Sequence, residues 1–184
     1  MLYTLAVSAI CGFCAKLSDF ASERQLQVPK VFAILSSIIY GAGLAFLTIS
    51  SPLSSLFLAL AFASTVCQKI DHPLHMLGLA VFTGFILIFP ISSFDAPLFC
   101  LFLALAIFDE LELKIFGSLS FLFENRLFVP IGAFLVFAYT GQIIFLASIL
   151  AFDIFYRLCE FVFKDYLVSA TKQKQSGKTK HILE

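Results

Sequence analysis

A short link between two apolar runs, Cys67–His75, carries the residues best suited to chemistry. It holds Lys69, Asp71, His72 and His75, and so two of the three histidines of the chain. A plain connector needs only Gly, Ser or Asn, and ionisable groups at the edge of a membrane core are costly to place there. Imidazole titrates near neutral pH and serves both as a general base and as a metal ligand. The link therefore predicts Asp71, His72 and His75 as catalytic residues.

Carboxylates gather in two further places that the fold must bring near this link. Asp19 and Glu23 are one helical turn apart, so on a continuous helix both point the same way. Asp109 and Glu110 open the densest acidic cluster of the chain. Each pair also fits a solvated helix end or loop that does no chemistry. The predicted metal-ligand set is Asp19, Glu23, Asp71, Asp109 and Glu110.

Another carboxylate, Asp153, lies inside the last apolar run. Counted back from Lys164 at about 1.5 Å per residue, it is roughly 16 Å deep in a bilayer core about 30 Å thick. A lone carboxylate there is costly, so Arg157, one turn later, is its expected partner. The two residues either belong to the site or form a structural pair that fixes helix packing. Asp153 is therefore added to the candidate catalytic residues.

These side chains indicate a divalent-metal site. Mg²⁺ prefers carboxylate oxygens together with substrate phosphates, whereas His72 and His75 favour Zn²⁺, Mn²⁺ or Fe²⁺. Mg²⁺ or Mn²⁺ is the first expectation, and Zn²⁺ is the alternative. Fixed positive charges hold phosphate oxygens. The candidates for that role are Lys69, Lys114, Arg126 and Arg157.

The composition requires lipid around most of the chain. Its 184 residues are 60% hydrophobic and 13% charged, with a mean hydropathy of +1.00. A soluble domain carries about 25% charged residues, and a core of this size cannot bury so much apolar surface. The formal net charge of zero argues against a nucleic-acid partner.

The predicted fold class is all-α, an integral membrane bundle of about seven transmembrane helices. A run of about 20 apolar residues spans a bilayer, and somewhat shorter runs are tolerated. The run 115–123 is too short to cross, and six spans are the fallback. Residues 1–168 are predicted to form the helical domain, and the polar residues 169–184 a disordered tail. The expected spans are 2–18, 31–49, 53–68, 74–90, 96–109, 127–140 and 142–163.

The connections between these runs alternate in charge. The set at 50–52, 91–97 and 140–142 is nearly uncharged, and every Lys and Arg falls on the other side. By the positive-inside rule that other side is cytoplasmic, so the N-terminus is outside and the tail is cytoplasmic. Leu56–Ala61 and Leu101–Ala106 have the same sequence. This identity indicates a parallel hairpin repeat, although two segments so rich in Leu, Ala and Phe also match by chance.

Three functions fit these residues. The first is a membrane-embedded, metal-dependent enzyme that transfers or hydrolyses the phosphate or diphosphate of a lipid at the cytoplasmic interface. Its acidic helix ends resemble those of the UbiA-class membrane prenyltransferases, but the chain lacks their Asn-Asp-x-x-Asp motif and is much shorter. The second is a proton- or ion-coupled transporter or channel that uses Asp153, Arg157 and His75. The third is a non-catalytic scaffold subunit. The oligomeric state, a homo-oligomer included, is left open.

Overall fold

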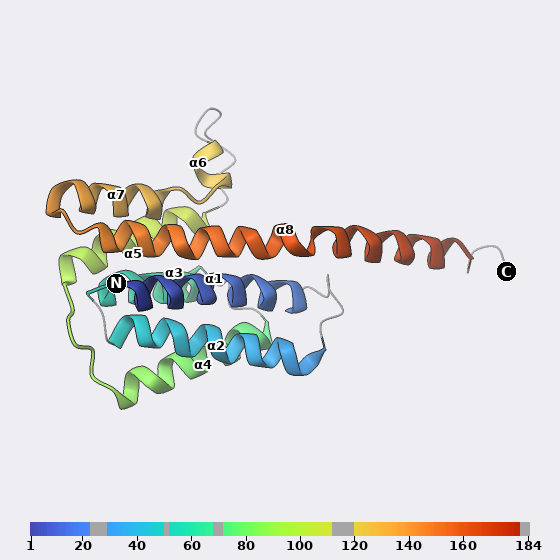
Figure 1. Cartoon of the computed structure of the whole chain (residues 1–184), viewed down its shortest axis with the longest axis horizontal. Coiled ribbons are helices and arrows are strands. Elements are labelled where there is room, and N and C mark those ends of the chain that lie inside the picture. Colours follow the sequence, from blue (N-terminus) through green and yellow to red (C-terminus); the bar gives the residue numbers. More distant parts are fainter. Residues whose placement is uncertain (23–28, 50–51, 68–71, 112–119, 181–184) are drawn as a thin grey trace.

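The described chain is built of helices and contains no strand. The computed structural model describes residues 1–22, 29–49, 52–67, 72–111 and 120–180. The predicted all-α class is confirmed. The helices are α1 (Leu2–Ser22), α2 (Lys30–Ile49), α3 (Ser54–Val66), α4 (Pro73–Ile88), α5 (Ala96–Glu110), α6 (Ser120–Glu124), α7 (Phe128–Thr140) and α8 (Ile143–Lys180) (Figure 1).

Each predicted apolar run corresponds to one helix, and the short α6 falls in the run that was expected not to cross. By length and composition α1 and α2 are able to cross a membrane, whereas α3, α4 and α7 are shorter apolar helices. The 13 residues of α3 rise only about 20 Å, against a bilayer core of about 30 Å. A bundle of seven spans is therefore not confirmed, and the multi-pass topology stays a prediction.

Apart from α6, successive helices run in opposite directions (Figure 1). α1 packs against α2 and α8, α3 against α2 and α5, and α7 against α5 and α8, so these helices close a ring. α4 lies against α2 and α1. The two copies of the predicted repeat fall on α3 and α5, which pack together, and the duplication itself stays a prediction. The ring brings the ends of α1 and α5 to the same end of the bundle as the starts of α4 and α7.

Aromatic side chains fill the half of the bundle toward the opposite end. Phe57, Phe102 and Phe145 are fully buried, and the rings of Phe102 and Phe145 stack with their centroids 5.9 Å apart. Phe57 and Phe145 lie in the first turns of α3 and α8. This half is therefore packed and apolar. Asp95, at the start of α5, is at this end, and the other described charged side chains lie toward the opposite end.

Gly12 allows α1 to touch the backbone of α8. A Cβ atom at this position would overlap the carbonyl oxygen of Phe152, and a Cβ at Gly41 on α2 would overlap that of Gly78 on α4. Small residues at a helix–helix contact allow the two backbones to approach this closely. The register of α1 on α8 therefore depends on Gly12.

Gly12→Ala is expected to lower the free energy of unfolding by about 2 kcal/mol, because a backbone oxygen cannot move aside as a side chain does. Thermal unfolding in detergent measures the loss. The matched control is Gly84→Ala on α4, where an added Cβ meets nothing within 4 Å. Equal losses in the two variants would contradict the close approach of α1 to α8.

The last helix is longer than the sequence predicts. α8 continues to Lys180 and projects well beyond the other helices (Figure 1). Residues 169–180 are therefore helical where a disordered tail was expected, and 181–184 lie outside the described residues. Ala, Lys and Gln are strong helix formers, which accounts for a helix with no apolar stripe. The division into a helical domain and a tail stays a prediction.

Candidate functional site

A cavity of about 560 Å³ lies inside the bundle and is lined by α1 to α5, α7 and α8. Its deeper wall is apolar and includes Leu44, Phe82 and Ile149. Nearer the end of the bundle its wall is polar. The ionisable side chains that line the cavity are Lys16, Asp19, Tyr40, His72, His75, Asp109, Glu110, Arg126, Asp153 and Tyr156.

Asp19 and His75 form the central pair of this cavity. His75 Nε2 lies 3.0 Å from Asp19 Oδ1, and the Tyr156 hydroxyl donates a hydrogen bond of 2.6 Å to Asp19 Oδ2. Three helices meet here, because Asp19 is near the end of α1, Tyr156 is on α8 and Pro73 starts α4 two residues before His75. A proton on Nε2 faces the carboxylate, which leaves the lone pair of Nδ1 available as a base or ligand.

Asp109 caps the neighbouring helix α7. Its Oδ1 accepts from the N–H of Phe128 at 2.9 Å and its Oδ2 from the N–H of Val129 at 2.8 Å. The N-cap residue Leu127 makes no side-chain cap of its own. A carboxylate that satisfies free N–H groups at a helix start is stabilising. Asp109 therefore fixes α7 against α5, and its predicted role as a metal ligand stays a prediction.

Arg126 is held in a conformation that few side chains adopt. Its φ is +51°, in the left-handed region. The N–H of Arg126 bonds to the carbonyl of Phe123, and the N–H of Leu127 to that of Leu122. These two bonds form the turn that ends α6, and Arg126 takes the left-handed position that glycine usually occupies in such a turn. Arg126 Nη2 lies 3.3 Å from Glu110 Oε2, without the alignment of a hydrogen bond.

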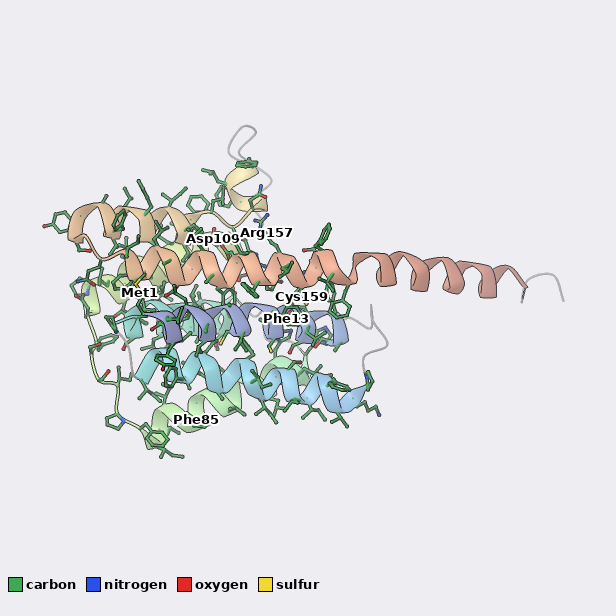
Figure 2. The ribbon with its side chains drawn as sticks, viewed as in Figure 1. Met1, Phe13, Phe85, Asp109, Arg157 and Cys159 are labelled. Atoms are coloured by element: carbon green, nitrogen blue, oxygen red, sulfur yellow. The ribbon has the colours of Figure 1, made fainter. Side chains whose placement is uncertain are left out.

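Asp153 and Arg157 do not form the expected ion pair. Asp153 lines the cavity, whereas Arg157 is exposed and its Nη2 donates to the carbonyl of Asn125 at 3.2 Å. Among the described side chains no ion pair joins the two residues. Figure 2 labels Arg157 on α8 and Asp109 at the end of α5. Arg157 contacts the turn before α7 and Asp109 the first residues of α7, but only Asp109 lines the cavity.

Lys16 and Tyr156 line the cavity but were not among the predicted site residues. Lys16 Nζ lies 4.8 Å from the Tyr156 ring, 4.9 Å from the Phe20 ring and 3.7 Å from Glu160 Oε2. The available signal for Tyr156 was a hydroxyl three residues after Asp153, on the same face of an apolar helix. Lys16 gave a weaker signal, because a lysine at a helix end is usually solvated.

The remaining predicted residues, Glu23, Lys69, Asp71 and Lys114, lie outside the described residues. His72 precedes α4 in an extended conformation and lines the cavity. Within the described ranges no three His, Cys, Asp or Glu side chains are grouped closely enough to hold a metal ion. Metal binding therefore stays a prediction.

The chain matches no known family model, no curated protein and no solved structure.

Proposed function

We propose that this protein is a multi-pass membrane enzyme that acts on the phosphate or diphosphate headgroup of a lipid at the cytoplasmic interface. One observation carries the proposal, namely the cavity that holds the Asp19–His75 pair together with Arg126 and Lys16. An imidazole oriented by a carboxylate is a general base. Fixed cations stabilise the charge of phosphoryl oxygens.

In this proposal His75 takes a proton from the attacking hydroxyl or water. Nδ1 is the base, and Asp19 stabilises the imidazolium that forms. The attacking oxygen forms a bond to phosphorus, the bond to the leaving oxygen breaks, and the proton passes from His75 to that oxygen. Arg126 and Lys16 bind the phosphoryl oxygens meanwhile. Attack by water gives hydrolysis, and attack by an acceptor hydroxyl gives transfer.

The lengths of the helices support a site recessed in the membrane. α3, α5 and α7 have 13, 15 and 13 residues, and so rise about 20 to 23 Å. If their uncharged ends lie at the outer surface, their polar ends lie inside a core about 30 Å thick. The basic residues at those ends favour a cytoplasmic orientation, with the N-terminus outside. A lipid phosphate would therefore move inward from the inner interface to reach the site.

A divalent ion is part of the proposal. Both oxygens of Asp19 and both of Asp109 already have partners. Mg²⁺ and Mn²⁺ are commonly held by one or two carboxylates together with substrate phosphates, so no preformed cluster of three protein ligands is required. Glu110 also lines the cavity, and Glu23 and Asp71, which lie outside the described residues, complete the predicted set of ligands. Zn²⁺ is the alternative ion.

The test is turnover by the full chain in vesicles. Purified protein is incubated with phosphatidic acid and with prenyl diphosphates of several chain lengths, with and without an alcohol acceptor, in Mg²⁺, Mn²⁺, Zn²⁺ or EDTA. Mass spectrometry of the extracted lipids is expected to detect loss or transfer of phosphate, abolished by EDTA. Folded protein that converts none of these lipids with any of the ions would overturn the proposal.

Tyr156→Phe is expected to lower this turnover about tenfold while the fold is kept. The variant retains the ring beside Lys16 but removes the hydroxyl that holds Asp19 Oδ2, so the carboxylate orients His75 less well. Steady-state kinetics should locate the loss in kcat rather than in KM. An unchanged kcat would exclude a positioning role for Tyr156.

The second candidate function, a proton or ion relay, rests on Asp153. This residue lines the cavity but makes no hydrogen bond or ion pair with another described side chain. Against a through path, Phe57, Phe102 and Phe145 fill the far half of the bundle. Ion or proton flux into liposomes that disappears in Asp153→Asn, without any lipid turnover, would favour the relay over the enzyme.

A further inference from the structure

α3 and α4 both line the cavity, but they do not pack against each other. α3 packs against α5 and α2, and α4 packs against α2 and α1, but these two consecutive helices make no extensive contact with each other. Yet both line the cavity, α3 with Leu60 and Ser64 and α4 with Leu79 and Phe82. The cavity therefore reaches the place where two neighbouring helices diverge.

At the apolar end of the bundle, two described hydrogen bonds hold the segment that follows α4. There the N–H of Ser92 donates to the carbonyl of Ile49 at 3.1 Å, and the N–H of Asp95 donates to Ser55 Oγ at 2.9 Å. These bonds tie the segment after α4 to the end of α2 and the start of α3. At the polar end the chain itself leads from Val66 to Pro73, and no hydrogen bond between described residues of α3 and α4 closes the space between the two helices.

Apolar side chains of α3 and α4 lie on both sides of this space. Met76, in the first turn of α4 and next to the cavity-lining His75, is 58% exposed. Leu60 and Leu79 are partly buried and pack against the core of the bundle. Leu60 and Leu79 thus give the cavity apolar sides between α3 and α4, close to His75, which lies one turn before Leu79 on α4.

We propose that the apolar chain of the lipid substrate enters the cavity sideways between α3 and α4. This inference rests on the proposed function and names the occupant as the hydrocarbon chain of a phosphate-bearing lipid. The chain leaves the cavity along Leu60 and Leu79, and the phosphate reaches Arg126 and His75. Such an entry spares the headgroup a passage through the apolar half of the bundle and leaves the chain in the bilayer.

The test compares a long-chain lipid phosphate with a short-chain, water-soluble phosphate of the same headgroup. Leu79→Trp is expected to lower kcat/KM for the long-chain lipid at least tenfold and to leave the soluble analogue within about twofold. Leu60→Trp, on the opposite side of the opening, should act in the same way. The control is Leu87→Trp, at an 81% exposed position of α4 outside the cavity, which should change neither rate.

Equal losses for both substrates, or no loss for the long-chain lipid, would overturn the proposed entry. If the wild type converts no phosphate lipid at all, the proposed function fails instead, and binding still tests the entry. A phosphatidic acid with a diazirine in its acyl chain should then label peptides of α3 and α4, and Leu79→Trp should reduce this labelling. Labelling confined to other helices would overturn the entry.

Discussion

His75→Gln is expected to lower lipid turnover about 10³-fold while the protein remains folded. Glutamine keeps a polar side chain of similar reach but has no basic nitrogen, so the attacking group keeps its proton. The loss should appear in kcat, because the basic side chains that bind the phosphate are unchanged. Rates from vesicles of equal protein content measure the effect, and unfolding temperatures verify the fold.

Asp19→Asn tests how much the orientation of His75 by Asp19 contributes, apart from the proton transfer by His75 itself. The variant is nearly isosteric, but its amide no longer stabilises a positively charged imidazole and can present an N–H to His75 Nε2. We expect a loss of about 10²-fold, smaller than that of His75→Gln. His72→Gln is the matched control, because His72 lies in the same cavity but Asp19 pairs with His75. A larger loss in His72→Gln than in His75→Gln would transfer the base to His72.

The helices were predictable from the sequence because hydropathy alone defines them. The runs bounded by Ser50–Pro52, Ile91–Pro97 and Thr140–Gln142 correspond to α2, α3, α4, α5, α7 and α8. What hydropathy does not give is length beyond the apolar part, since the helical propensity of residues 169–180 extends α8 without an apolar run. Hydropathy also does not give the number of membrane crossings, because a helix such as α3 is apolar enough to cross a membrane but shorter than a full span.

The candidate site was predictable by residue type and not by pairing. Asp19 and His75 were both predicted as site residues. Their contact could not be predicted from their spacing, because they lie on different helices, α1 and α4. Asp153 and Arg157 illustrate the reverse case. Their spacing fits a pair on one helix face, yet the turn after α6 offers Arg157 the carbonyl of Asn125. Interhelical contacts decide the partners, and helix order alone does not contain them.

Arg126→Gly is expected to lower turnover about 10²-fold with little change in stability. At φ +51° an arginine is strained by about 1 kcal/mol, and glycine adopts this conformation freely. The relief offsets the loss of the pair with Glu110, which is weak because the Arg126 side chain is 55% exposed. Most substitutions at a binding site change stability and activity together, whereas Arg126→Gly should change activity alone. The unfolding temperature should stay within about 3 °C of wild type.

The loss in Arg126→Gly should come from the phosphate. Arginine presents a planar fork to phosphoryl oxygens, and removing one such donor from a site costs about 10² to 10³ in rate. Arg126→Lys should recover part of the activity, because it restores the charge without the fork. Arg157→Ala is the control, since that guanidinium is exposed and outside the cavity, and it should retain at least half of the wild-type rate. If Arg157→Ala were the more damaging variant, the phosphate would bind outside the cavity, and the chemistry proposed for His75 would have no substrate within reach.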